Sequence, residues 1–327
     1  MRSSRRIADD PAPAELSAAW WEGVRITGTA VWCDARRARD ICFVSHAYAA
    51  DALRHGQLIA TRPTLALLAR KDRRQQPESQ LAVPYGRPFT LGQLRFELFR
   101  SGHAAGAASL SLERDGVRAV YAGAVNPRGG GLGGVADVRR CDTLVIDAHY
   151  GHPRFAFPDV SETRDAVVAF ADETVRAGAV PVLLVTSPAK GLDVAQQITN
   201  VRPVRAHRAI HHAAQRLRGE GESVPRLKRW AGKLPRGEVV VWLADSDDSP
   251  SSPDTRVALV SGEPHPSAAR HFAHFPWSNR ADHAELVRYI AATGARRVFA
   301  VGRYADYLAG TLDNVTALGP ARQLNLF

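Results

Sequence analysis

The segment CFVSHAYAADALRHGQLIATRPTLALLA occupies residues 42–69 and combines three patterns in a short space. It begins with an apolar run that ends in Ser45 and His46, continues through a short loop, and leads to a helix. Within it, GQLIAT (residues 56–61) has the composition of a strand. The segment therefore predicts a histidine in the loop that follows a strand.

Short β-like runs separated by Gly, Asp and Pro dominate residues 20–151 around this segment. They are VRITGTAVWCD, DICFVSH, LRFELFRSG, ASLSLER, VRAVYAG and CDTLVIDAHYG. After Pro158, ETRDAVVAFADETVRAGAVPVLLVTSP predicts an amphipathic helix, a Gly stop and a buried strand, and AHRAIHHAAQRLRG predicts another helix. GEVVVWLAD predicts a strand, and DHAELVRYIAATGARRVFAVGRYADYLAG predicts helix, strand and helix. This order predicts a β-rich sandwich that carries an inserted α/β segment.

The composition is typical of a globular protein with a basic balance. The chain has 327 residues, of which 45% are hydrophobic, and 43 Lys and Arg face 33 Asp and Glu, for a net charge of +10. Such an excess favours partners with a phosphate backbone. An Arg-rich composition also follows from coding bias in GC-rich genomes, so the charge alone leaves both explanations open.

The cysteines and the N-terminus indicate a reduced compartment. Cys33, Cys42 and Cys141 lie in apolar, strand-like runs without CxxC spacing, which predicts buried thiols and neither disulfides nor a zinc knuckle. The N-terminal residues lack the apolar stretch of a signal peptide, and no apolar run of membrane-spanning length occurs. We therefore expect a cytoplasmic protein without a membrane partner.

Six further segments, in chain order, accompany residues 42–69: VWCDARR (31–37), VPYG (83–86), SGHAAGAASLSLERDG (101–116), VYAGAV (120–125), CDTLVIDAHYGHPRFAFP (141–158) and HFPWSNRADHAELVRYI (274–290). Together they resemble the motifs of metallo-β-lactamase-fold nucleases with a β-CASP insertion, and among these the DNA-ligase-associated exonucleases. The resemblance extends over residues 25–312. It implies an α/β fold, a four-layer αββα metallo-β-lactamase sandwich with an inserted α/β domain of β-CASP type.

The resemblance also implies a division of the chain. Residues 19–155 and 280–318 would form the metallo-β-lactamase-like domain, and residues 156–279 the β-CASP-like insertion. Residues 1–18 are charged and contain proline, which predicts a flexible N-terminal arm. Residues 319–327 would form a C-terminal tail.

Ordinary members of this family hold two zinc ions that hydrolyse phosphodiesters, and hydrolysis of this kind needs clustered His and carboxylate ligands. On the resemblance, four positions keep a possible ligand: Asp34, His46, His103 and Asp147. Six positions depart from the pattern: Tyr48, Ala50, Asp51, Ala124, Arg280 and Val301. Ala124 replaces the aspartate that bridges both metals, and Arg280 replaces a histidine. A guanidinium stays charged and repels cations, so we expect no metal and a vestigial pocket formed by Asp34, His46, Asp51, His103, Asp147 and Arg280.

Two hypotheses remain for this pocket. In the first, Arg280 takes the place of the cation as counter-charge to Asp34 and Asp147, within a buried hydrogen-bond network. In the second, His46, Asp51, His103 and Asp147 hold one rewired zinc or manganese ion, with His149 and His152 nearby in sequence.

The last five residues, Gln323, Leu324, Asn325, Leu326 and Phe327, follow the breaker pair Gly319-Pro320. Gln-Leu-x-Leu-Phe resembles the pentapeptide by which bacterial repair proteins dock on the sliding clamp. Leu324, Leu326 and Phe327 would supply apolar anchors and Gln323 a hydrogen bond at the rim of the pocket. The alternative is a tail that folds back on the core.

Two basic stretches are candidates for contact with phosphates. The first, RKDRRQQ, contains Arg70, Lys71, Arg73 and Arg74, and the second, RLKRWAGKLPR, contains Lys228, Arg229 and Trp230. Trp230 has a ring that can stack on an unpaired base. Stretches of this kind are more often solvated loops.

These features predict a catalytically degenerate exonuclease-like protein that binds DNA or RNA in repair or replication and is recruited by the sliding clamp. A DNA ligase, a helicase or another repair protein would be its partner. Two alternatives remain open. One is an active metal-dependent DNA or RNA exonuclease with a reorganised site, and the other is a non-enzymatic scaffold between the clamp and a repair partner.

Overall fold

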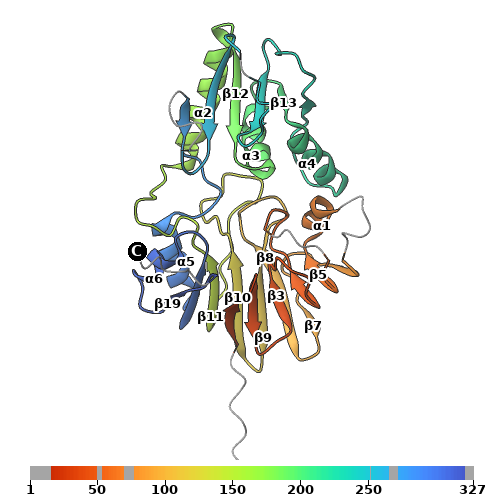
Figure 1. Cartoon of the computed structure of the whole chain (residues 1–327), viewed down its shortest axis with the longest axis vertical. Coiled ribbons are helices and arrows are strands. Elements are labelled where there is room, and N and C mark those ends of the chain that lie inside the picture. Colours follow the sequence, from red (N-terminus) through yellow and green to blue (C-terminus); the bar gives the residue numbers. More distant parts are fainter. Residues whose placement is uncertain (1–15, 50–53, 70–76, 251, 265–271, 321–327) are drawn as a thin grey trace, which may run out of the picture.

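Three β-sheets and six helices organise the chain in the computed structural model, which describes residues 16–49, 54–69, 77–250, 252–264 and 272–320 (Figure 1). The protein is therefore mixed α/β. Of the expected N-terminal arm, residues 1–15 lie outside the described residues. Leu16 is fully buried and Ser17 begins the first strand, so this end of the expected arm belongs to the first sheet.

The first sheet has its six strands in sequence order: β1 (Ser17–Trp20), β2 (Val24–Thr27), β3 (Val31–Cys33), β4 (Ile41–Phe43), β5 (Gln57–Ala60) and β6 (Ser79–Ala82). Strands β1, β2 and β3 pair antiparallel, and β3 to β6 pair parallel. Parallel pairing brings the carboxyl ends of β3 and β4 to the same edge. Asp34 and Ser45 follow these two ends.

The second sheet has seven strands: β7 (Phe89–Leu91), β8 (Leu94–Arg100), β9 (Ala108–Arg114), β10 (Val117–Gly123), β11 (Thr143–Asp147), β18 (Arg297–Val301) and β19 (Val315–Ala317). Strands β7 to β10 form antiparallel pairs, whereas β10, β11, β18 and β19 run parallel. In the register of β11 and β18, Asp147 lies opposite Val301. The ends of three parallel strands thus meet at one edge.

These two sheets pack face to face through an apolar core. Phe43 and Ile59 of the first sheet share this core with Phe96, Leu110 and Val145 of the second, and all five side chains are almost fully buried. Apolar residues alternate along the strands of both sheets and supply the two inner faces. The core therefore holds the two strand edges, and the residues that follow them, in a fixed relation.

Helices cover the outer faces of the two sheets. Leu68 of α1 (Arg62–Leu68) packs on the first sheet beside Cys42 and Leu58. On the second sheet, α5 (His283–Thr293) and α6 (Ala305–Ala309) pack through apolar residues that include Leu286 and Leu308. The layers therefore follow one another in the order α1, first sheet, second sheet, and then α5 with α6.

The third sheet lies in the upper part of Figure 1 and comes entirely from the chain between β11 and α5. Its strands, all parallel, are β12 (Val180–Val185), β13 (Val204–Ala206), β14 (Lys228–Arg229), β15 (Val239–Leu243), β16 (Thr255–Val260) and β17 (Ala273–Phe275), in the order β14-β13-β15-β12-β16-β17. One face is covered by α2 (Val160–Arg176), α3 (Pro188–Ile198) and α4 (Arg208–Gly219). Apolar residues around Trp242 cover the other face.

The helix boundaries follow the capping signals of the sequence. Asp159 caps α2, and Asp282 and Glu285 form a capping box at the start of α5, which ends at Gly294 with φ 64°. The predictions of α2, α4, α5 and the strands around them are confirmed. Helix α3 was not predicted, although Ser187 caps it and Pro188 is its first residue, a combination typical of a helix start.

In the part of the chain that the structure describes, no helix is both long and apolar enough to cross a membrane.

Candidate functional site

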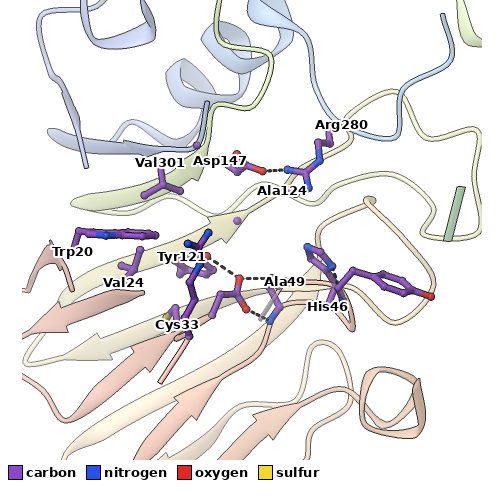
Figure 2. Close-up of a pocket in the computed structure, with 16 residues that line it drawn as sticks. Trp20, Val24, Cys33, His46, Ala49, Tyr121, Ala124, Asp147, Arg280 and Val301 are labelled. Atoms are coloured by element: carbon purple, nitrogen blue, oxygen red, sulfur yellow. Dashed lines mark hydrogen bonds and ion pairs between the residues drawn. The ribbon is translucent and has the colours of Figure 1, made fainter. Parts of the chain in front are cut away.

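The strand ends of the first two sheets enclose a cavity of about 190 Å³ (Figure 2). Its wall on the first sheet includes Asp34 and His46, and its wall on the second includes Ala124, Asp147 and Val301. The parallel pairing of β10, β11 and β18 sets these last three residues side by side. The structure thus brings most of the predicted pocket together. Asp51 and Ala50 lie outside the described residues.

Asp34 is held by neutral hydrogen-bond donors. It directly follows β3 with φ 48°, a left-handed conformation that Asp tolerates better than most residues. Its Oδ1 accepts the Ser45 backbone N–H at 2.7 Å, and its Oδ2 accepts the hydroxyls of Ser45 at 2.6 Å and Tyr121 at 2.8 Å. Burial raises the pKa of this carboxyl, while the bonds from Ser45 and Tyr121 and the charge of Arg280 oppose the rise.

Arg280 forms an ion pair with Asp147 on the other wall of the cavity. Its Nη1 donates to Asp147 Oδ2, and Figure 2 shows the pair directly above the position of Ala124. The two side chains are 28% and 15% exposed. Burial lowers the pKa of Arg280 to about 10, so the guanidinium stays charged at neutral pH. Arg280 therefore neutralises one of the two aspartates, and Asp34 is satisfied by Ser45 and Tyr121.

Gly302 allows Asp147 to take this position. It follows β18 with φ +101°, and a Cβ atom at residue 302 would lie 2.4 Å from Asp147 Oδ1. A side chain there would thus be strained by the backbone conformation and would displace the carboxylate. The absence of a side chain at Gly302, directly after β18, leaves room for the carboxylate of Asp147 at the end of β11.

His46 lines this cavity, and His103, which lines an adjoining one, lies beside it with ring centroids 4.5 Å apart. The Tyr48 N–H donates to His46 Nδ1 at 3.2 Å, which leaves the proton of neutral His46 on Nε2. His103 Nδ1 lies 3.0 Å from the Asn279 carbonyl oxygen, which can only accept, so His103 carries its proton on Nδ1. Burial lowers the pKa of His46 to about 3 and the pKa of His103 well below its ordinary value. Both rings are neutral at physiological pH.

The residues of this cavity do not fit a paired-cation centre. A metal-bound histidine usually donates its other ring N–H to a carbonyl or carboxylate, and only His103 has that arrangement. Asp34 already accepts three hydrogen bonds, and Asp147 is paired with a guanidinium. The side chain of Ala124 has no atom that could bind a metal. Among the residues with described positions, no group of three or more His, Cys, Asp or Glu side chains is arranged to hold a metal ion.

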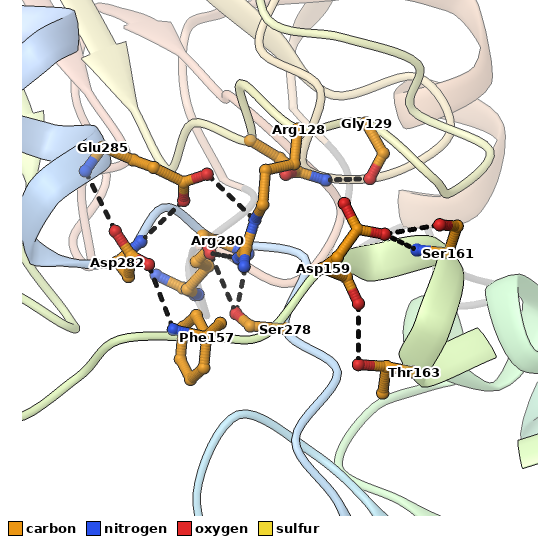
Figure 3. Close-up of polar contacts among 11 residues, drawn as sticks. Arg128, Gly129, Phe157, Asp159, Ser161, Thr163, Ser278, Arg280, Asp282 and Glu285 are labelled. Atoms are coloured by element: carbon orange, nitrogen blue, oxygen red, sulfur yellow. Dashed lines mark hydrogen bonds and ion pairs between the residues drawn. The ribbon is translucent and has the colours of Figure 1, made fainter. Parts of the chain in front are cut away.

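A second polar network fixes the backbone of Arg280 (Figure 3). Ser278 Oγ accepts the Arg280 N–H at 2.9 Å and donates to the Arg280 carbonyl at 3.0 Å. Arg128 Nη2 donates to the same carbonyl at 3.0 Å, and Arg128 Nε forms an ion pair with Glu285 at 3.1 Å. Asp282, the cap of α5, also accepts the Phe157 N–H at 3.1 Å. Arg128 is thus a positioning residue for Arg280, which the sequence did not single out.

Two further cavities adjoin the central one. A cavity of about 590 Å³ shares Trp20, Arg36 and Gly302 with it. A cavity of about 320 Å³ on the other side shares His46, Tyr48 and Arg280 with it. The three therefore lie in a row across the strand edge. Tyr48 is 40% exposed and forms part of this row.

The buried charges of α3 had no counterpart in the sequence predictions. Lys190 is 2% exposed, and its Nζ lies 4.4 Å from the centre of the Trp277 ring. Burial lowers the pKa of this ammonium to about 8. Asp193, one turn further along α3, accepts the Leu132 N–H at 2.8 Å. Asp193 thus ties α3 to the loop between β10 and β11, and Lys190 contacts Trp277 after β17. The cap of α3, Ser187, lines the 320 Å³ cavity.

The predicted nucleic-acid contacts are only partly placed by the structure. Arg70, Lys71, Arg73, Arg74 and the tail residues Gln323, Leu324, Leu326 and Phe327 lie outside the described residues. Lys228 and Arg229 are exposed in β14, and Lys228 Nζ bonds Glu238 at 2.6 Å. Trp230 is half-buried and packs edge-on against Trp242, 5.6 Å between centroids. Its ring contributes to the core of the third sheet.

Three further histidines, His149, His152 and His207, have other surroundings. His152 Nδ1 accepts the Arg154 N–H at 3.0 Å, and its ring packs on Tyr307. His207 caps α4 by accepting the Ala209 N–H at 3.2 Å. His149 lines the 320 Å³ cavity.

No family model matches the chain. A protein of Opitutus terrae described as a probable DNA ligase is 26% identical over 310 residues, which cover 90% of this chain. The chain spans about 30% of the length of that curated relative. A crystal structure of a protein of unknown function from Enterococcus faecalis V583 has a TM-score of 0.58 at 13% identity, over 87% of this chain and 79% of that one. That likeness concerns the fold alone.

Proposed function

We propose that this protein is a catalytically degenerate member of the metallo-β-lactamase-fold nucleases that binds nucleic acid in DNA repair or replication. The observation that carries the proposal is the ion pair between Arg280 and Asp147. It places a fixed organic cation where the resemblance predicts metal ions, beside Ala124, which has no lone pair to offer. A guanidinium cannot generate a hydroxide or exchange its ligands as a metal does.

The layer order supports the proposed fold and domain division. A helix, two facing sheets and two further helices follow one another, and the third sheet comes from the chain between β11 and α5. This is the arrangement that a four-layer sandwich with a β-CASP-like insertion requires. We propose that the sandwich comprises residues 19–155 and 280–318, extended by residues 16–18 of the first sheet, and that the insertion comprises residues 156–279.

A DNA partner is supported by charge and by the likeness to a ligase. The net charge of +10 favours a polyanion, and the matching relative is described as a probable DNA ligase. Because the aligned region makes up only 30% of that relative, we propose a DNA ligase as the partner protein of this chain. The clamp-like motif at residues 323–327 would bring both to replication or repair sites.

The proposal is tested by metal content and nucleolysis of the protein purified without chelator. We expect zinc and manganese well below one per chain, and no degradation of single-stranded or duplex DNA or RNA with either metal added. Near-stoichiometric metal, together with a nuclease activity that His103→Ala abolishes, would establish the active exonuclease instead. His212→Ala, on the exposed face of α4, is the matched control.

Binding is measured separately, by fluorescence anisotropy with labelled DNA at several salt concentrations. We expect an affinity that falls steeply as salt rises, because bound arginines release counterions from the phosphates. An absence of salt-dependent binding would support the scaffold alternative. Deleting residues 323–327 is expected to abolish capture by a purified sliding clamp while DNA binding persists.

A further inference from the structure

A group of aromatic rings, partly exposed, gathers where the loop after β11 meets the start of α6, the short helix that follows β18. The ring of Tyr307 is 54% exposed and lies 4.2 Å from the ring of His152, and Tyr304 lies 5.9 Å from Tyr307. Phe155, beneath them, is 5.2 Å from Tyr304. Tyr307 contributes little to the core, so its exposure at this point calls for a different explanation.

Two arginines accompany these rings. The guanidinium carbon of Arg154 lies 4.7 Å from the ring centre of Phe155 and 5.1 Å from that of Tyr304. That of Arg303 also lies 5.1 Å from the Tyr304 ring, with Nη1 2.6 Å from Glu263. Ring contacts hold both guanidinium groups in place, and Arg303 is still 57% exposed. The surface therefore combines stacking faces with two guanidinium groups, of which Arg303 is paired with Glu263 and Arg154 is exposed.

The same loops form the walls of the three adjoining cavities. Gly302 lines the central cavity and the 590 Å³ cavity, and Arg303 lines the latter together with Trp20 and Arg36. His149, at the start of the other loop, lines the 320 Å³ cavity. A cavity of 590 Å³ lies within the size range of small-molecule sites and is large enough for a nucleotide.

We propose that Tyr307, His152, Arg154 and Arg303 form a stacking site for an unpaired base of a single-stranded nucleic acid, next to the cavity row. This inference rests on the proposed nucleic-acid function and assigns the binding to a particular surface of the protein. Bases stack on aromatic rings and guanidinium planes only when they are unpaired, and arginines nearby attract the backbone phosphates. The positive charge favours a nucleic acid over an apolar peptide at this surface. Deoxyribose and ribose strands share this chemistry.

The test compares the affinities of a fluorescein-labelled single strand of 12 nucleotides and the matching duplex for wild-type protein and Tyr307→Ala, in DNA and in RNA form. We expect Tyr307→Ala to weaken single-strand binding about tenfold and duplex binding less than twofold, because stacking on one base is lost. Tyr307→Trp should retain tight binding. Phe272→Ala, an exposed aromatic of the third-sheet region, is the control and should leave both affinities unchanged.

A second measurement detects stacking directly. A strand with one 2-aminopurine should lose fluorescence on binding to the wild type, and the loss should be smaller with Tyr307→Ala. Equal affinities and equal quenching for wild type and Tyr307→Ala would overturn the stacking site, even if Arg303→Ala weakens binding. Failure of the wild-type protein to bind any nucleic acid would overturn the proposed function as well. The tighter of the DNA and RNA forms identifies the strand that the site prefers.

Discussion

The rings of His46 and His103 lie 4.5 Å apart, and their Nδ1 atoms face backbone groups of opposite character, a donating N–H of Tyr48 and an accepting carbonyl of Asn279. We therefore expect opposite tautomers at pH 7, Nε2–H for His46 and Nδ1–H for His103. Long-range ¹H–¹⁵N correlation spectra of labelled protein distinguish the two. Two Nδ1–H tautomers would instead indicate a pair of rings prepared for metal binding.

Stability should fall as the solution becomes acidic. Burial lowers the pKa of His46 from 6.5 to about 3, so below pH 6.5 the unfolded chain binds a proton that the folded chain refuses. The contribution of neutral His46 to the free energy of unfolding is fully present above pH 6.5 and is lost as the pH falls from 6.5 toward 3. Between pH 7.5 and 5.5, His46 alone should cost about 1 kcal/mol of unfolding free energy. His103, whose pKa burial also lowers, acts in the same direction.

Urea unfolding at pH 7.5 and 5.5 measures this loss. His46→Asn should show a smaller loss than the wild type over this interval, whatever its absolute stability. His212→Asn, exposed on α4, should keep the wild-type loss. An unchanged pH response in His46→Asn would contradict the prediction.

The pair of Arg280 and Asp147 should couple more strongly than a surface pair. Both side chains are largely removed from water, so either single change leaves a charge without its partner. In a double-mutant cycle of Arg280→Ala and Asp147→Ala, we expect a coupling of about 1–3 kcal/mol in unfolding free energy. The pair Arg62–Glu220, with Arg62 80% exposed, is the control and should couple by less than about 1 kcal/mol. Equal couplings would show that Arg280 does not serve as the counter-charge.

Gly302→Ala should destabilise the protein by two additive effects, the positive φ and the approach of the new Cβ to Asp147 Oδ1. Gly178→Ala isolates the first effect, because Gly178 has φ +81° and no atom lies within 4 Å of the place that its new methyl group would take. We expect a cost of about 1 kcal/mol for Gly178→Ala and at least twice that for Gly302→Ala, measured by chemical unfolding. Similar costs would mean that Asp147 moves freely away from residue 302.

Local patterns were enough to predict most of the secondary structure. The helices capped by Asp159 and Asp282 show capping residues and apolar periodicity, and the strands around Val145 and Val241 are continuous apolar runs. Helix α3 was missed because its apolar residues are interrupted by Lys190 and Asp193, which are buried and contact Trp277 and Leu132. Such contacts are remote in sequence and leave no local pattern.

Some features of the candidate site could likewise be predicted from the sequence, whereas others depend on the tertiary structure. Residue types alone establish that alanine at 124 and arginine at 280 cannot supply metal ligands, because donor atoms belong to the side chain itself. Which partner Arg280 takes depends on the parallel register that sets Asp147 beside Val301 and on the loop held by Ser278 and Arg128. The tautomers of the two histidines likewise depend on backbone groups. The stacking surface depends on the loop after β11 and on the segment from Arg303 into α6, which are far apart in the chain and meet because β11 pairs with β18. The sequence determines whether a side chain has a metal-ligating atom. Which side chains pair, and which remain exposed, is decided only when the strands assemble into sheets.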